Sequence, residues 1–428
     1  MAETALPRPA AMPRSAVAIL AAGMALRLIW ALLMPVHPVS DSAAYEAFAW
    51  TLVDHGVYGW NADQPSAYWA VGTSAIAAAT FLLLGKSYAG IVALNLLAGL
   101  VAMVVTWRLA RLYYGGSAAL AALAVMAFWP NLIFFTSILS SELYFIALTV
   151  TGWYFWARPE GRPWLNLILA GLIWGLACYV RPVILLLPAA FAIAALSQGP
   201  AATLRGTVRA ALVIALIVLT VSPWTLRNAE VIGKPFLVSS NFNANLWMGN
   251  NPDSRGGYTP LPPEVEAMPE AERDAYLGAQ VRDYIRDDPL HFAGDVARRT
   301  LLLHSRETIG VAWNLQAIEA RLGAAAVPAA KLIATGYWYL VLIAALAGVA
   351  LSVRRSGLGG LFHPVFGGWA YFTAVHAIIV AEDRYHMPAV PFMAVLAGLA
   401  IGRVLSRYRM AREPSLAPRD RERRPGWR

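Results

Sequence analysis

Long apolar runs separated by short polar stretches occupy most of the chain, which is the pattern of a protein that crosses a membrane repeatedly. Ten of these runs cover residues 16–34, 88–107, 117–136, 143–157, 164–180, 183–197, 210–226, 332–353, 361–380 and 387–405. We therefore expect an all-α polytopic membrane protein with about ten transmembrane helices. The first run contains Arg27 and is long for a signal peptide, so we expect an uncleaved anchor.

One more apolar run, residues 69–85, is shorter and contains Gly72, Thr73 and Ser74. A helix of this length measures about 25 Å, whereas the hydrocarbon core of a bilayer is about 30 Å thick. We expect it to be an interfacial or re-entrant helix that does not cross.

The distribution of arginine supports this topology. If residues 69–85 do not cross, the arginines that flank the later runs all fall on one face, as expected for the cytoplasmic side. They are Arg108, Arg111, Arg158, Arg162, Arg205, Arg209, Arg354, Arg355 and those of the tail from Arg403 to Arg428. Both chain termini then lie in the cytoplasm, and the polar segments between the other ends of the runs face outward.

The spacing of the runs divides the chain into four parts. We expect residues 1–226 to form an N-terminal membrane module with a first outer loop at 35–87, and residues 227–331 to form a small outward-facing segment. Residues 332–412 supply the last transmembrane helices. The charged, proline-containing tail at 413–428 is expected to be disordered.

The first outer loop should contain a helix of its own. Pro38 ends the preceding run, Ser40 or Asp41 can cap a new helix, and Gly56 can end it. Apolar residues between them fall on one side, which suits a helix lying in the membrane surface.

Composition excludes several classes of protein. Hydrophobic residues make up 58% of the 428 residues and charged residues 14%, and the mean hydropathy is +0.53, so a soluble enzyme is excluded. The net charge of +9 comes from arginines at the ends of apolar runs, so nucleic-acid binding is not expected. Cys178 is the single cysteine, which excludes an intrachain disulfide and a cysteine metal site.

Asp41 is the first candidate catalytic residue. Placing an acidic side chain just beyond a membrane helix costs free energy, so such a residue is often functional. The alternative is that Asp41 only caps the helix that follows. Tyr45 lies one turn further along the same helix and is a candidate for substrate contact.

A series of short motifs follows the outward-facing segments. In order they read SDSAAYEAFAWTLVDHGVYG, PSAYWAVG, SSELYF, YVRP, PWTLRN, NLWMGNNPDSRGGY and EDRYHMPAVPF. Their order and spacing resemble bacterial members of the protein mannosyltransferase and aminoarabinose transferase group, over about residues 35–396. Two departures are Ser42, where many relatives carry a second acid, and residues 69–74, which lack the prolines of W-P-x-G-Y-P.

The resemblance implies the GT-C fold and a glycosyltransferase of the bacterial inner membrane whose active site faces the periplasm. Its donor would be a sugar on a polyprenyl phosphate, and its acceptor a glycan, a lipid or a protein. Asp41 would be the general base, an effect of about 10² to 10⁴ in rate. One base without a covalent step implies inversion at the anomeric carbon.

Other residues suit the remaining tasks of such a reaction. Arginine grips phosphate with two parallel bonds, so Arg181 and Arg384, the latter beside Tyr385, are candidates for the phosphate, with Lys86 a weaker one. Amides and an aromatic ring commonly bind sugars, so Asn245, Trp247 and Asn250 are candidates for the sugar, and Glu142 for the acceptor or a cation. Each has a structural alternative: an interfacial cation, a turn-forming asparagine, or a helix cap for Glu142.

No cofactor is predicted. His37, Asp41 and His55 share one loop without the spacing of a metal motif, so a divalent cation is possible but unsupported by a motif. No glycine-rich loop for a nucleotide is visible. Two other classes remain open: a transporter of lipid-linked sugars, which more often shows internal repeats, and a noncatalytic assembly subunit, which would tolerate Asp41→Ala.

Overall fold

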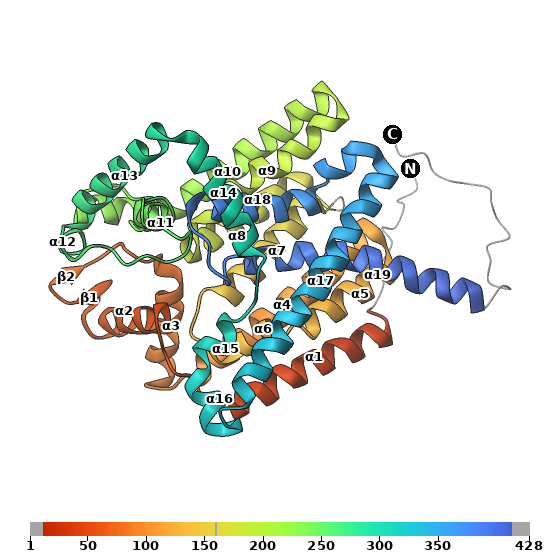
Figure 1. The fold of residues 1–428 in the computed structure, drawn as a ribbon, viewed down its shortest axis with the longest axis horizontal. Coiled ribbons are helices and arrows are strands. Elements are labelled where there is room, and N and C mark those ends of the chain that lie inside the picture. Colours follow the sequence, from red (N-terminus) through yellow and green to blue (C-terminus); the bar gives the residue numbers. More distant parts are fainter. Residues whose placement is uncertain (1–11, 159–160, 413–428) are drawn as a thin grey trace.

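The computed structural model describes residues 12–158 and 161–412, with side chains as far as residue 408. The tail predicted to be disordered at 413–428 lies outside the described residues. The molecule is elongated and almost entirely helical (Figure 1). Eleven of its helices correspond in position to the ten apolar runs, because the third run forms both α5 and α6; the sixth forms α9 with its flanking turns.

The helices of the bundle are α1 (Arg14–Leu33), α4 (Ala89–Tyr114), α5 (Gly116–Ala127), α6 (Pro130–Phe134), α7 (Glu142–Ala157), α8 (Pro163–Val180), α9 (Leu187–Ile193), α10 (Pro200–Ile232), α17 (Ala326–Ser356), α18 (Pro364–Ile379) and α19 (Val390–Arg412). Short 3₁₀ turns flank some of them: η1 (Phe135–Ser137), η2 (Pro182–Ile184), η3 (Ala194–Gln198), η4 (Gly357–Phe362) and η5 (Met387–Ala389).

The described chain is that of a multi-pass membrane protein, but ten crossings are not confirmed. Six helices are long and apolar enough to span a bilayer, and a seventh is obtained if α5 and the α6–η1 segment, bent by 53°, form one span. Several expected spans are shorter than 18 residues. Residues 183–197 divide into η2, α9 and η3, and α7 has 16 residues, or about 24 Å at 1.5 Å per residue.

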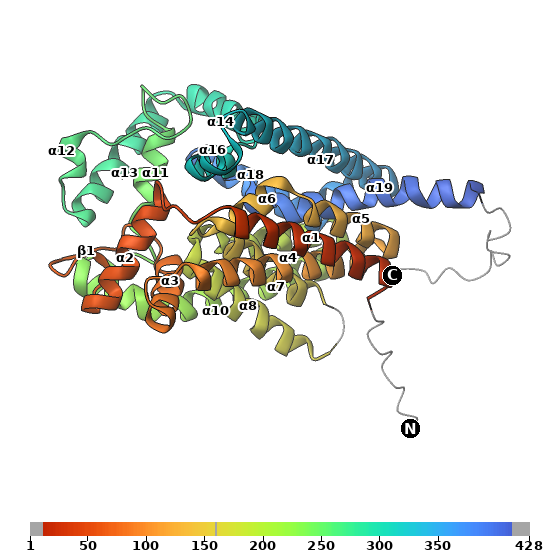
Figure 2. The same cartoon turned by 90° about the horizontal axis from the view of Figure 1, so that it is seen from below.

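The remaining elements gather at one end of the molecule, which we name the loop end. From the first outer loop come α2 (Asp41–His55), β1 (Gly59–Asn61), β2 (Gln64–Pro65) and α3 (Val71–Leu84). From the later segment come α11 (Phe242–Gly249), α12 (Pro263–Glu266), α13 (Glu270–Asp287), α14 (Pro289–Leu303), α15 (Ile309–Trp313) and α16 (Leu315–Leu322). Figures 1 and 2 place the hairpin β1–β2, α2 and α11–α13 far from the start of α1 and the end of α19.

The helix predicted in the first outer loop is confirmed as α2. It ends at Gly56, which takes the left-handed conformation with φ 68°, where glycine has no steric penalty. Its buried side packs against α3 through Tyr45, Ala49 and Ala78.

The charge within the first apolar run is explained by the packing of α1 on α5. Arg27 is buried and donates to the carbonyl oxygens of Met126 at 2.9 Å and Ala127 at 2.8 Å, and to that of Gly23 in its own helix at 3.0 Å. Met126 and Ala127 form the last turn of α5, whose carbonyls have no partner within the helix. The bend between α5 and α6 thereby gives a buried guanidinium its acceptors.

Candidate active site

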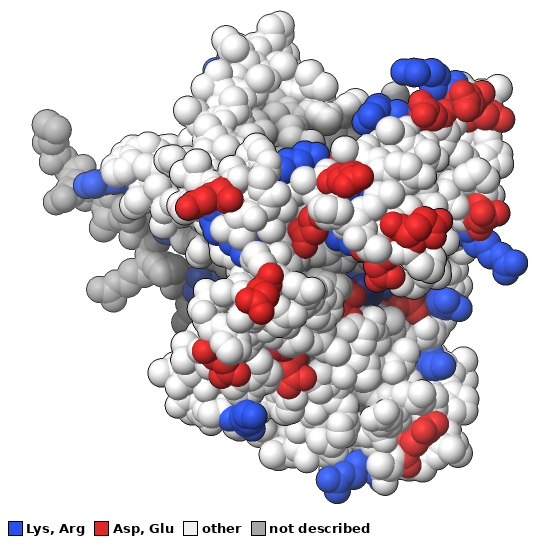
Figure 3. Space-filling model, turned by 90° about the vertical axis from the view of Figure 1, so that its left-hand side faces the viewer, with Lys and Arg blue, Asp and Glu red and all other residues white. Residues whose placement is uncertain are grey.

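A cavity of about 670 Å³ opens at the loop end. It is bordered by α2, the turn that follows α8, α11 and the segment 380–385. Figure 3 faces this end and shows acidic and basic side chains over it, some of them recessed. Six of the residues expected in the site line this cavity: Asp41, Tyr45, Arg181, Asn245, Arg384 and Tyr385.

Asp41 is the first residue of α2, and it lines the cavity. Its Oδ2 accepts a hydrogen bond from Nη2 of Arg384 at 2.6 Å. The N-cap position belongs to Ser40, which makes no side-chain capping bond, so Asp41 is not the N-cap of this helix. Ser40 has φ 54°, the only positive φ among the described non-glycine residues; such strain is often stored beside functional groups.

Arg384 lies in the loop between α18 and η5 and is 9% exposed. Its Nη1 is 3.8 Å from Oε1 of Glu142, and its guanidinium lies 4.8 Å from the ring centre of Trp313. Burial alone would lower the pKa of Arg384. The nearby Asp41, Tyr385, Glu142 and Tyr45 together outweigh it, and the pKa is raised well above the ordinary value. The guanidinium therefore remains charged.

Glu142 connects the two arginines. It begins α7, is 2% exposed, and its Oε1 accepts from Nη2 of Arg181. Arg181 ends α8 and also donates through Nε to Oγ of Ser141 at 2.8 Å. Oε2 of Glu142 is buried and has no hydrogen-bond partner among the residues that the structure describes. Asp41, Arg384, Glu142 and Arg181 thus form a chain of alternating charges.

Tyr45 and Tyr385 stand beside this charge chain. Tyr45 is buried and Tyr385 is partly buried. Burial, with the negative charge of Asp41 adding to it, raises the pKa of each. They stay neutral and can donate a hydrogen bond to an anion in the cavity.

Three of the expected site residues lie elsewhere. Lys86 follows α3 and places its Nζ 5.3 Å from the ring centre of Trp50, outside the cavity lining. Trp247 packs with Leu277 in an apolar cluster between α11 and α13. Asn250 is fully buried and donates to the carbonyl oxygen of Ile378 at 3.0 Å.

The fixed position of Arg384 depends on residues that sequence reasoning missed. Oδ2 of Asp383 accepts from the backbone N of Thr308 at 2.9 Å and from its Oγ1 at 2.6 Å. His386 lies with Nδ1 2.9 Å from the carbonyl oxygen of Leu303 and Nε2 3.2 Å from Oε1 of Glu307. Asp383 and His386 flank Arg384 in the EDRYH motif, which was the available signal.

Glu307 is the centre of that support. It is fully buried, and its two oxygens accept from Nε1 of Trp129 at 2.9 and 2.8 Å. Both ring nitrogens of His386 face oxygen atoms, which fixes the orientation of the imidazole ring. Nothing in the sequence around Glu307 marked it as a partner of residue 386.

Aromatic side chains on the cavity wall were also missed as site residues. They are Trp60, Tyr68, Trp69, Phe242, Tyr258 and Trp313. Burial raises the pKa of Tyr68 to about 12, so it remains an uncharged donor. Tyr68 and Trp69 belong to the PSAYWAVG motif, and flat aromatic faces at a cavity wall can stack on sugar rings.

A metal site is not found among the described residues: no group of three or more histidine, cysteine, aspartate or glutamate side chains is placed to hold an ion. His37, Asp41 and His55, which share one loop in the sequence, are not brought together as ligands.

In a comparison with known protein families, residues 68–226 match the dolichyl-phosphate-mannose-protein mannosyltransferase family. This confirms the resemblance to glycosyltransferases indicated by the motifs. No curated protein sequence matches the chain.

Solved structures show the same fold at low sequence identity. The Archaeoglobus fulgidus oligosaccharyltransferase AglB, in complex with an inhibitory peptide and a dolichol-phosphate, has a TM-score of 0.56 at 12% identity. The alignment covers 95% of this chain and 52% of AglB, so this chain spans about half the length of that protein. The fold is therefore GT-C-like.

A second similar structure is ArnT from Cupriavidus metallidurans. Its apo state has a TM-score of 0.44 at 15% identity, covering 94% of this chain and 80% of ArnT. Its complex with undecaprenyl phosphate has a TM-score of 0.45 at 14% identity, covering 94% and 81%.

Proposed function

We propose that this chain is a membrane glycosyltransferase that moves a sugar from a polyprenyl phosphate carrier to an acceptor, with inversion at the anomeric carbon. The observation that carries the proposal is the convergence of Asp41, Glu142, Arg181 and Arg384 from four distant segments at one cavity. The family matched by residues 68–226 uses a dolichyl-phosphate sugar by its description, and AglB binds dolichol-phosphate.

Asp41 is the proposed general base. One carboxylate oxygen is held by Arg384, and among the described residues no donor contacts the other, Oδ1. That oxygen can take the proton of an acceptor hydroxyl or amine as it attacks the anomeric carbon. The bond from that carbon to the phosphate oxygen breaks, and the electron pair leaves with the polyprenyl phosphate.

Arg384 and Arg181 are proposed to bind the phosphate. Negative charge grows on the leaving oxygen as the bond breaks, and charged donors fixed in a buried site stabilise it more than water does. The two carboxylates that hold these arginines in place keep the guanidinium groups ordered before the donor arrives. Tyr385 and Tyr45 are neutral donors at the same position.

The proposed sugar pocket consists of Asn245 and the aromatic wall of Tyr68 and Trp69, all of which line the cavity. The proposed orientation has the loop end in the periplasm of a bacterial inner membrane. It rests on the arginines of the opposite end, which would be cytoplasmic. Ten crossings, with α3 at the interface, are part of this proposal.

Reconstitution in lipid nanodiscs tests the donor class. Purified protein is given a panel of synthetic polyprenyl phosphate pentoses and hexoses, or the matching nucleotide sugars, with candidate acceptors. We expect a glycosylated product and free polyprenyl phosphate only from the lipid donors, and an anomeric configuration in the product opposite to that of the donor. Transfer from a nucleotide sugar without a lipid carrier, or retention of configuration, contradicts the mechanism.

A further inference from the structure

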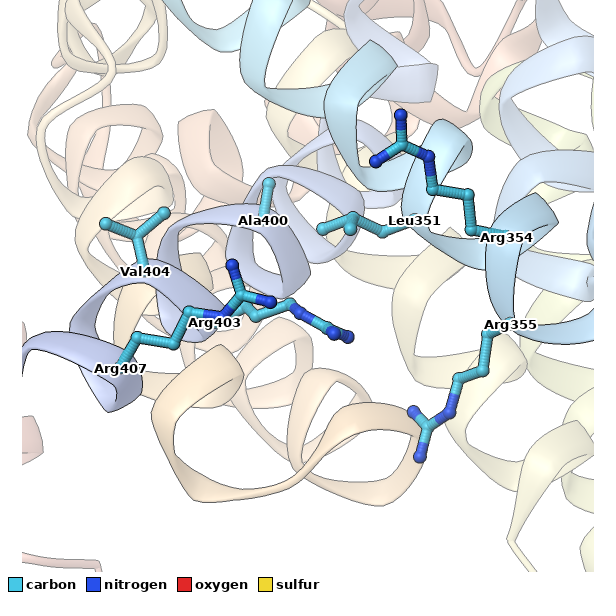
Figure 4. A pocket seen from close by; sticks show the side chains of 7 residues that line it. All are labelled: Leu351, Arg354, Arg355, Ala400, Arg403, Val404 and Arg407. Carbon is cyan, nitrogen blue, oxygen red and sulfur yellow. The ribbon is translucent and has the colours of Figure 1, made fainter. Parts of the chain in front are cut away.

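A groove between α17 and α19, at the end opposite the loop end, is lined by four arginines. Arg354 and Arg355 come from the last turn of α17, and Arg403 and Arg407 from α19. The groove has a volume of about 310 Å³, and Leu351, Ala400 and Val404 complete its wall. Figure 4 shows Arg403 extending from α19 towards the arginines of α17. We name these residues the arginine groove.

The described protein supplies no anion to neutralise the arginine groove. None of the four guanidinium groups is in an ion pair within the described part of the chain. At this end the described segments 108–117, 161–163, 194–209, 353–364 and 402–412 contain no aspartate or glutamate. Four like charges around one small groove repel each other, and an external anion bound there would offset this repulsion.

The surroundings of the groove indicate where that anion comes from. On α17, Ile343 and Leu346 are 64% and 53% exposed and lie two turns before Leu351 and Arg354 on the same helix faces. On α19, Val404 is 66% exposed. Exposed apolar side chains on membrane helices face acyl chains, so the groove lies where such a stripe meets the headgroup layer.

We propose that the arginine groove binds the phosphodiester headgroup of an anionic membrane lipid, with the acyl chains along α17 and α19. Arginine pairs a planar fork with two phosphate oxygens, and basic pockets between membrane helices are suited to anionic headgroups. The alternative is that each arginine contacts the headgroups independently. That alternative would not explain why four arginines from two helices line one groove. The site is separate from the cavity at the loop end and does not depend on the proposed reaction.

Native mass spectrometry of the full chain in detergent tests the proposal. The probes are phosphatidylglycerol, phosphatidylcholine with the same acyl chains, and inorganic phosphate. We expect phosphatidylglycerol to bind at least 10-fold more tightly than phosphatidylcholine, and the double variant R403Q/R407Q to lose about 30-fold of that affinity. R354Q/R355Q should lose a similar factor, which keeps the test valid if one of the variants does not fold.

The matched control is R162Q/R205Q, which removes two exposed arginines from the same end outside the groove. It should retain wild-type affinity for phosphatidylglycerol, and the melting temperature shows whether each variant is folded. Equal binding of the two lipids, full affinity in both folded groove variants, or an equal loss in the control overturns the proposal. Displacement of phosphatidylglycerol by millimolar inorganic phosphate overturns the lipid as the ligand and assigns the groove to free phosphate.

Discussion

Nη2 of Arg384 lies 2.6 Å from Oδ2 of Asp41, although 343 residues separate them in the sequence. The pair joins the start of α2 to the loop before α19, and through Glu142 it reaches the end of α8. The proposed base and the proposed phosphate ligand are therefore neighbours in one charge chain, and changing either affects both. The predictions below separate their roles.

Asp41→Asn should lower turnover by about 10² to 10⁴, or about 3–5 kcal/mol in barrier, because the amide keeps the shape but cannot take a proton. The measurement is turnover with a lipid donor in nanodiscs, alongside the melting temperature. Asp54→Asn, at the exposed end of the same helix, is the control and should have little effect. Normal turnover in a folded Asp41→Asn protein would show that another group is the base.

Arg384→Ala should reduce kcat/KM. The loss corresponds to a few kcal/mol of transition-state stabilisation, since two charge-assisted contacts in a buried site are lost. Arg384→Lys should restore part of the activity, because a single ammonium cannot reach both Asp41 and Glu142. Arg306→Ala is the control. The Arg306 side chain is 68% exposed, its Nε is as far as 3.9 Å from Oδ2 of Asp383, and such exposed pairs contribute little to stability. Equal effects of Arg384→Ala and Arg306→Ala would argue against phosphate binding by Arg384.

The segment α3 should not cross the membrane, since its 14 residues make only about 21 Å of helix. Ser87→Cys in a Cys178→Ala background should react with an impermeant thiol reagent from the periplasm. Cys178 is the single cysteine and is buried, so its removal leaves one labelled position. Labelling of residue 87 from the cytoplasm alone would reverse the topology of every later span.

Glu307→Ala should destabilise the protein by about 3–5 kcal/mol, because it leaves the buried donor of Trp129 and Nε2 of His386 without their hydrogen-bond partner. Glu307→Gln keeps an acceptor and should cost less. The exposed Glu319→Ala is the control. Thermal unfolding in detergent measures all three, and equal melting temperatures for Glu307→Ala and Glu319→Ala would contradict a supporting role for this carboxylate.

Stability should fall as the pH drops below about 6.5, the ordinary pKa of histidine. Burial lowers the pKa of His304 in the folded chain, so near pH 6 the unfolded chain binds a proton that the folded chain does not, and acid favours unfolding. The ring accepts from Nε1 of Trp369 at 3.2 Å, a bond that protonation of Nε2 removes. The loss in melting temperature between pH 7.5 and 5.5 should be smaller in His304→Gln; an equal loss would exclude His304 as the source.

The local part of the fold could be predicted from the sequence because its causes are local. An apolar run forms a helix in a bilayer since its backbone groups can bond only within the segment, so the described helices follow the ten runs closely. Proline, serine, aspartate and glycine around residues 38–56 predicted α2, because the signals that start and end a helix are also local. How many helices cross was not determined this way, because breaks such as that between α5 and α6 depend on packing against α1 and Arg27.

The candidate site also has a part that could be predicted from the sequence and a part that could not. The sequence by itself singled out Asp41, Glu142, Arg181 and Arg384, because charged residues at the ends of apolar runs are costly and therefore informative. Only the tertiary structure decided that these four meet, that Asn250 supports the backbone of α18, and that Lys86 stacks on Trp50 outside the cavity. Such contacts join segments far apart in the chain, and no local spacing encodes which distant partner satisfies a buried charge.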